Sequence, residues 1–170
     1  VCFSDLSYLH VNCGTCHRFN GGGMVPAYLN IETALKEARL LRAQSTRGDL
    51  GLPESRVIVP GDPARSVLLY RMATLGRGHM PYLGTKLVDE LGVRLVRDWI
   101  ASLKATPKDA SAATRTQRLA ETNALAQLVA GDATPLDTLL ASGSGALSVA
   151  LAVNDGTLRG ALRDQAVAKG

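Results

Sequence analysis

The chain has few aromatic residues and no long apolar run. Phe, Trp and Tyr make up 4% of its 170 residues. A transmembrane helix needs a run of about 18 apolar residues, and none occurs, so we predict no transmembrane segment in this chain. No basic cluster is interleaved with aromatic residues, and we therefore expect no nucleic-acid binding. Hydrophobic residues still account for 46% of the chain, which is enough to build a core.

Cysteine and histidine are also scarce, with three of each, and half of them fall in the segment Cys13-Gly14-Thr15-Cys16-His17. This C-x-x-C-H pattern is typical of the attachment site of a c-type haem. Two thiols at this spacing can each add to one vinyl group of the same porphyrin, and the adjacent imidazole can then ligate the iron. The motif predicts one covalent haem c, bound by Cys13 and Cys16, with His17 as an axial ligand.

Two other interpretations of the cysteine pair are open. Zinc would need four Cys or His ligands, and beyond the motif the chain offers only Cys2, His10 and His79. A thioredoxin-like redox pair would need a strand before the motif and a βαβ unit after it, whereas a flexible glycine-rich loop over residues 18–23 follows instead. Cys2 is left without a role, and we expect a buried thiol because its neighbours are apolar.

An electron carrier needs a second axial ligand on its iron, and the chain has three methionines. Met72 falls on the apolar face of a helix predicted over residues 62–75, so we expect it in the core. Met24 lies too close in sequence to His17 to reach the opposite face of the haem. These two methionines are therefore not the predicted ligand.

Met80 is the predicted distal ligand. It lies in a loop rich in Gly and Pro, residues 76–84, where a thioether has little reason to sit unless it faces something apolar. A loop methionine that packs against the core is the alternative. We expect the adjacent His79 to reach solvent or a haem propionate.

Six stretches between residues 10 and 103 follow one another in an order typical of a single family. They are residues 12–18, 48–51, 56–69, 79–81, 88–89 and 99–100. In this order they resemble the class I cytochrome c domains of planctomycete-type and sugar-dehydrogenase-associated haem proteins. The resemblance implies an all-α class I cytochrome c fold with long loops, in which the haem is held by Cys13, Cys16, His17 and Met80. Tyr82 departs from the family, which commonly has proline there.

Apolar periodicity places helices in both halves of the chain. Residues 4–10 and 89–103 are predicted helices, and a cytochrome of this class packs its first and last helices together beside the haem. Beyond a linker over residues 104–111, short helices are predicted over residues 114–130, 134–141, 144–153 and 157–168. We therefore divide the chain into a monohaem cytochrome c domain, residues 1–106, and a small helical appendage, residues 107–170, expected to begin a further region of a longer protein.

The function expected from these features is one-electron transfer rather than enzymatic catalysis. The net charge of +4 belongs wholly to residues 1–106 and could steer an acidic redox partner. Because c-type haem is attached outside the cytoplasmic membrane, we expect a periplasmic or otherwise extracytoplasmic redox assembly. A peroxidase-like haem enzyme with a labile distal ligand and a structural subunit with an incidental haem are the alternatives. The chain starts at Val1 with no visible leader, so we expect a processed protein or a piece of a longer one.

Overall fold

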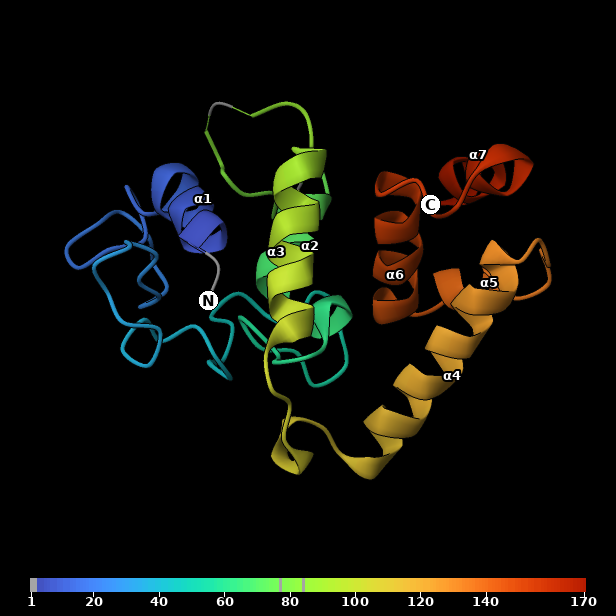
Figure 1. The fold of residues 1–170 in the computed structure, drawn as a ribbon, viewed down its shortest axis with the longest axis horizontal. Coiled ribbons are helices and arrows are strands. Elements are labelled where there is room, and N and C mark those ends of the chain that lie inside the picture. The colour runs from blue at the N-terminus through green and yellow to red at the C-terminus, as the bar shows by residue number, and fades with distance from the viewer. Residues whose placement is uncertain (1–2, 77, 84) are drawn as a thin grey trace.

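The computed structural model describes residues 3–76, 78–83 and 85–170, and Cys2 therefore lies outside the described residues. Within these ranges the protein has seven α-helices and no β-strand, which confirms the all-α prediction (Figure 1). Two isolated backbone bridges pair Leu41 with Ile58 and Arg56 with Ser66. No helix in the described part of the chain is both long and apolar enough to cross a membrane. A class I cytochrome c fold stays a prediction.

Three α-helices belong to the first part of the chain and four to the second. The first three are α1 (Phe3–Cys13), α2 (Val67–Ala73) and α3 (Glu90–Ser102). The other four are α4 (Ala112–Val129), α5 (Leu136–Leu140), α6 (Gly143–Asn154) and α7 (Gly160–Lys169). Two 3-10 helices, η1 (Pro63–Arg65) and η2 (Pro107–Asp109), precede α2 and α4 respectively. Residues 14–62 contain no helix.

Helix α3 forms as predicted because an N-cap and a regular apolar face coincide. The Asp89 carboxylate accepts the backbone N–H of Gly92 at 3.0 Å, and Val96 and Ile100 are fully buried. Helix α1 packs against this end of α3, where the Tyr8 hydroxyl donates to Asp89 at 2.9 Å. A β-carbon at Gly92 would lie 2.1 Å from that hydroxyl oxygen, so only glycine fits the contact. The predicted pairing of these two helices is confirmed.

The helix predicted over residues 62–75 is divided in two by Ser66. This residue is extended, with φ −92° and ψ 110°, so η1 ends before it and α2 begins after it. Its hydroxyl accepts the backbone N–H of Val59 at 3.0 Å and donates to the Asp62 carbonyl at 2.9 Å. The apolar spacing predicts one continuous helix because it contains no information about the hydrogen bonds between Ser66 and the preceding loop.

Two separate cores hold the helices together, and α6 contributes to both. The first core contains buried side chains of α1, α2 and α3, and the second lies among α4, α5, α6 and α7. Leu147 and Leu151 of α6 belong to the first core, whereas Val149 and Ala152 belong to the second. Helix α6 therefore joins the appendage to the rest of the protein (Figure 1). The division into residues 1–106 and 107–170 stays a prediction.

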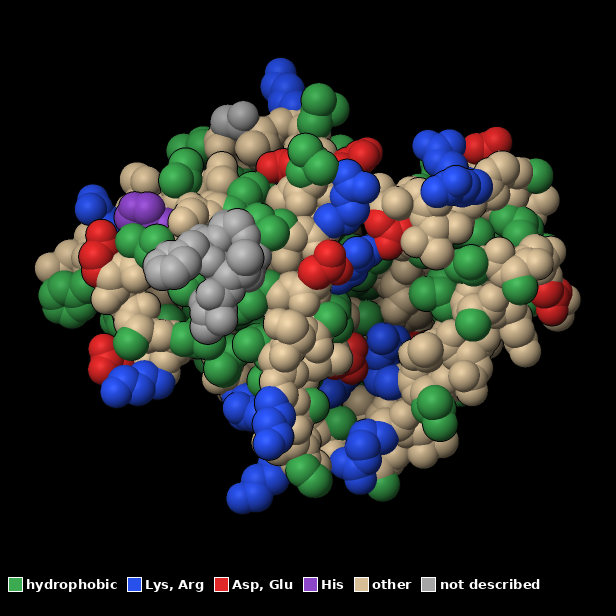
Figure 2. All heavy atoms as spheres, viewed as in Figure 1, with side chains coloured by type: hydrophobic (Ala, Val, Ile, Leu, Met, Phe, Trp, Pro, Cys, Tyr) green, Lys and Arg blue, Asp and Glu red, His purple; other side chains and the backbone are tan. Residues whose placement is uncertain are grey.

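Acidic and basic side chains lie next to one another along the junction between the two cores (Figure 2). Arg118 of α4 pairs with Asp62 at 3.2 Å and with Glu121. Glu121 is only 8% exposed and accepts from the hydroxyls of Ser142 at 2.7 Å and Ser144 at 2.9 Å. Burial alone would raise the pKa of Glu121, but hydrogen bonds, led by that of Ser142, hold it below its usual value. The network stays charged at neutral pH and ties α4 and α6 to the first core.

Candidate functional site

The C-x-x-C-H motif forms one tight turn at the end of α1. Cys13 is the last residue of the helix, and its carbonyl accepts the backbone N–H of Cys16 at 3.2 Å and that of His17 at 2.9 Å. A β-carbon at Gly14 would lie 2.6 Å from the His10 carbonyl oxygen, so the turn requires glycine there. Both cysteines of the motif are free, with Cys13 half-buried and Cys16 exposed. One turn therefore brings together three of the four predicted site residues.

Two further glycines, predicted only as residues of a flexible loop, pack against the motif. A β-carbon at Gly21 would lie 2.3 Å from the Cys16 carbonyl oxygen, and one at Gly23 would lie 2.9 Å from it. At Gly23 the added carbon would also come within 2.9 Å of His17 Nδ1. The Gly23 N–H donates to the Cys16 carbonyl at 2.9 Å. The glycine run is part of the site, and its signal in the sequence is its place shortly after His17.

The His17 imidazole is held by packing rather than by hydrogen bonds. Its Nδ1 is buried and has no hydrogen-bond partner among the described residues, although a buried unpaired polar atom costs free energy. Burial, and after it the positive charge of Arg71, lowers the pKa of His17 below its usual value. The ring is therefore neutral at pH 7, which is the form that ligates a metal. Because Gly23 covers the Nδ1 edge, Nε2 is the nitrogen left to do so.

The surroundings of Cys13 do not favour the other interpretations of the cysteine pair. Burial, and after it the charge of Cys16, raises the pKa of the Cys13 thiol to about 11. A redox-active pair needs a lowered pKa instead. In the described ranges no three His, Cys, Asp or Glu side chains come together to hold a metal ion, so the zinc interpretation gains no support.

The three methionines differ in their exposure. Met72 is 6% exposed and belongs to the first core, as predicted, whereas Met24 is 76% exposed. Met80 is half-buried in the loop between α2 and α3, and its N–H donates to the Arg71 carbonyl at 2.9 Å. The Arg71 guanidinium also donates to the Gly78 carbonyl at 2.8 Å. Both bonds fix the Met80 loop to the last turn of α2.

The charge of Arg71 also acts on the C-x-x-C-H turn. Its positive charge acts on the pKa of His17, so its guanidinium lies within electrostatic range of that ring. The residue that holds the Met80 loop therefore also favours the neutral form of His17. Nothing in the sequence spacing singles out Arg71 for this role. Met80 as the distal ligand stays a prediction.

Exposed apolar side chains concentrate on the two segments that carry the predicted ligands. The six most exposed large apolar residues within the described ranges are all at least 73% exposed. Three lie close to the motif in sequence and three follow Met80: Val11, Phe19, Met24, Tyr82, Leu83 and Leu87. Large apolar side chains that are exposed on both segments are candidates for contact with a bound apolar group. Together with the free thiols of Cys13 and Cys16 and with His17 Nε2, these side chains fit a large apolar group such as a porphyrin.

Comparisons of the chain with family models, with curated proteins and with solved structures give no match. The resemblance to class I cytochrome c domains and the haem itself therefore stay predictions. The resemblance rests on the six sequence stretches, and the haem prediction rests on the motif, on the packing of His17 and on the bonds that fix the Met80 loop.

Proposed function

We propose that this chain carries single electrons through one haem c, bound covalently to Cys13 and Cys16, with His17 and Met80 as axial ligands. The observation that carries this proposal is the turn at the end of α1, where two free thiols and a neutral, partly buried imidazole lie together. In this proposal the first domain has a class I cytochrome c fold. It works with a redox partner protein, within a larger assembly in the periplasm or another extracytoplasmic compartment.

The residues of the site have separate tasks. Cys13 and Cys16 anchor the cofactor, while Gly23 keeps the His17 ring oriented so that Nε2 can ligate. When bound, the haem supplies a reversible one-electron couple, and His/Met ligation gives it a higher reduction potential than bis-histidine ligation would. The exposed apolar side chains near the motif and after Met80 limit the access of water to the cofactor.

The contacts of His79 support an electron carrier over a peroxidase-like enzyme. Such an enzyme needs a side chain that is free to accept and donate protons beside the iron. His79, which adjoins Met80, has both ring nitrogens engaged within its own loop region. Its Nδ1 lies 2.7 Å from the Thr74 carbonyl oxygen and its Nε2 lies 2.7 Å from the Thr85 hydroxyl oxygen.

Denaturing mass spectrometry tests the proposal on protein produced in an extracytoplasmic compartment that contains haem-attachment machinery. We expect the mass of the chain plus one haem, together with the pyridine haemochrome spectrum of a c-type haem. The matched control, Cys13→Ala with Cys16→Ala, should carry no covalent haem. Loss of haem from the original chain on denaturation, or zinc bound through these cysteines, would contradict the proposal.

Met80→Ala tests the distal ligand in the haem-loaded protein. The variant should lose the weak sulfur-to-iron absorption at the red end of the oxidised spectrum, and its reduction potential should fall. Met24→Ala is the matched control, and we expect it to keep both properties. If Met80→Ala keeps the absorption, another group completes the coordination of the iron.

A further inference from the structure

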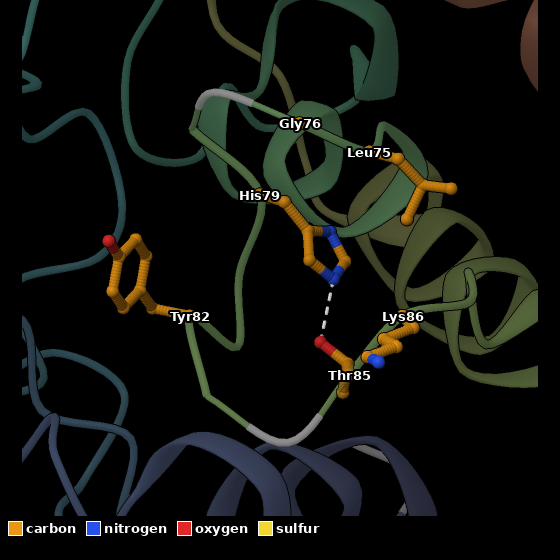
Figure 3. A pocket seen from close by; sticks show the side chains of 6 residues that line it. All are labelled: Leu75, Gly76, His79, Tyr82, Thr85 and Lys86. Atoms are coloured by element: carbon orange, nitrogen blue, oxygen red, sulfur yellow. Dashed lines mark hydrogen bonds between the residues drawn. The ribbon is translucent and has the colours of Figure 1, made fainter.

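The described residues of the loop after α2, 76, 78–83 and 85, fold back toward the end of α2, and His79 is the side chain that closes this loop (Figure 3). Its ring points toward Thr85, whereas Tyr82 points away to the other side of the loop (Figure 3). The sequence predicts a His79 ring that reaches solvent or a haem propionate. The structure instead places the ring against groups of the protein itself, within a cavity lined by the segment that follows α2, including Leu75, and by the loop.

The hydrogen bonds of the ring join three points of the chain. Nδ1 lies 2.7 Å from the Thr74 carbonyl oxygen and 3.1 Å from that of Arg71. Carbonyl oxygens only accept, so Nδ1 carries the proton and donates. On the other side of the ring, Nε2 lies 2.7 Å from the Thr85 hydroxyl oxygen, whose single proton is donated either to Nε2 or to the Pro81 carbonyl oxygen at 2.8 Å. The ring thus bridges the end of α2 and the returning arm of the loop.

The end of α2 supplies acceptors because the last carbonyls of a helix have no partner within it. Arg71 lies in the last turn of α2, and Thr74 directly follows the helix. The Arg71 carbonyl accepts the Met80 N–H at 2.9 Å and lies within reach of the His79 ring. Two consecutive residues of the loop, His79 and Met80, are therefore attached to the same helix end.

We propose that His79 is a positioning residue that holds the Met80 loop in place so that the Met80 sulfur stays on the iron. The inference rests on the proposed function, since it presumes a haem with Met80 as distal ligand. His79 itself does not ligate. Its ring resists the opening of the loop that an incoming external ligand requires, because opening breaks the bonds to Thr74 and Thr85.

Titration of the ferric, haem-loaded protein with imidazole measures this resistance, because imidazole binds only after Met80 leaves the iron. Two hydrogen bonds of ordinary strength predict that His79→Ala binds imidazole about tenfold more tightly than the unaltered protein. His79→Asn, whose amide can replace the Nδ1 donor, should recover part of the difference. Thr85→Val removes the contact of the hydroxyl to Nε2 and its contact to the Pro81 carbonyl oxygen but leaves the Nδ1 bonds, so it should have a smaller effect in the same direction.

Lys86→Ala is the matched control, because Lys86 lines the same cavity and is exposed. We expect it to leave the imidazole affinity unchanged. A second control uses the Met80→Ala background, where there is no sulfur to displace. In that background His79→Ala should change the affinity by less than about twofold, because a residue that acts only through Met80 has nothing left to act on.

Several results would overturn the inference. They are an unchanged imidazole affinity in His79→Ala, or an equal effect of His79→Ala with and without Met80. Circular dichroism shows whether a variant folds, and if His79→Ala does not, the His79→Asn and Thr85→Val titrations decide. Failure of the proposed function looks different, since the mass would then show no covalent haem or Met80→Ala would keep the sulfur-to-iron absorption. If His79→Ala removed that absorption and Met80→Ala did not, His79 would be the ligand and the inference would be wrong.

Discussion

The first part of this protein, residues 1–106, and the second part, residues 107–170, differ in how much of the chain is helical. We call them the first half and the second half. In the first half, residues 14–62 contain no helix, whereas in the second half four α-helices follow one another with short connections. Loops of such length without secondary structure are uncommon in compact domains unless they serve a function. The proposed haem would account for this difference, because a cofactor replaces part of the core that helices would otherwise form.

The backbone conformations of the two halves show the same contrast. Among the described residues, every non-glycine residue with positive φ lies between residues 20 and 54: Asn20, Arg39, Arg42, Leu50 and Glu54. Such conformations cost of order 1 kcal/mol or more each and persist only where surrounding contacts enforce them. In the second half the residues with positive φ are glycines at turns, such as Gly131 and Gly156. Backbone strain from non-glycine residues with positive φ is therefore confined to the loop-rich half among the described residues.

The largest expected effect comes from removing both haem attachment points, with Cys13→Ala and Cys16→Ala together. Without the cofactor the loop-rich half should lose most of its structure, while the helices around the second core stay folded. Hydrogen exchange should show protection lost in α1 and α3 and retained in α4. If α4 lost protection to the same extent, the two halves would form one cooperative unit and the contrast between them would not hold.

A second prediction compares two buried leucines that belong to different cores. Leu147 of α6 is 3% exposed in the first core, and Leu139 of α5 is 1% exposed in the second. Replacing either by Ala should cost about 2–5 kcal/mol of stability. Thermal unfolding followed by haem absorption should respond to Leu147→Ala, and unfolding followed by circular dichroism should respond more to Leu139→Ala. Identical responses by both probes would argue against separate cores.

A third prediction concerns the charged junction between the halves. Glu121→Gln keeps the shape of the side chain but removes the charge that Arg118 and the two serine hydroxyls surround, which should cost roughly 1–3 kcal/mol in urea unfolding. Asp137→Asn is the matched control, because its pair with Lys169 is exposed and should contribute less than about 1 kcal/mol. Equal losses of unfolding free energy in both variants would show that burial of Glu121 at the junction does not increase its contribution to stability.

The smallest expected effect is on acid stability at the linker. The Arg42 hydrogen bonds, first among several causes, lower the pKa of Asp109 from 3.8 to about 2. Because the folded protein holds this carboxylate ionised, its contribution of about 1 kcal/mol is complete above pH 3.8 and disappears as the pH falls toward 2. The unfolding free energy of Asp109→Asn should be lower at neutral pH and should converge with that of the unaltered protein in acid. A constant difference across this range would mean that Arg42 does not act through the charge.

The sequence predicts best those features that short-range geometry controls. The Asp89 cap and apolar face of α3 depend on residues a few positions apart, and both agree with the structure. The last helix illustrates the limit of such patterns. The spacing predicts a start at Thr157, whereas α7 begins at Gly160 because Asp155 holds the Thr157 N–H in a turn.

The sequence by itself determined the all-helical class, the C-x-x-C-H turn and the placement of Met80 in a loop, because each follows from residue spacing and turn chemistry. Only the tertiary structure decided that Ser66 divides a helix, that the charge of Arg71 acts on His17 and that His79 closes the Met80 loop. These features arise where segments distant in the chain meet. Contacts between such segments produce no periodic pattern of residues in the sequence, so they can be identified only in the folded structure.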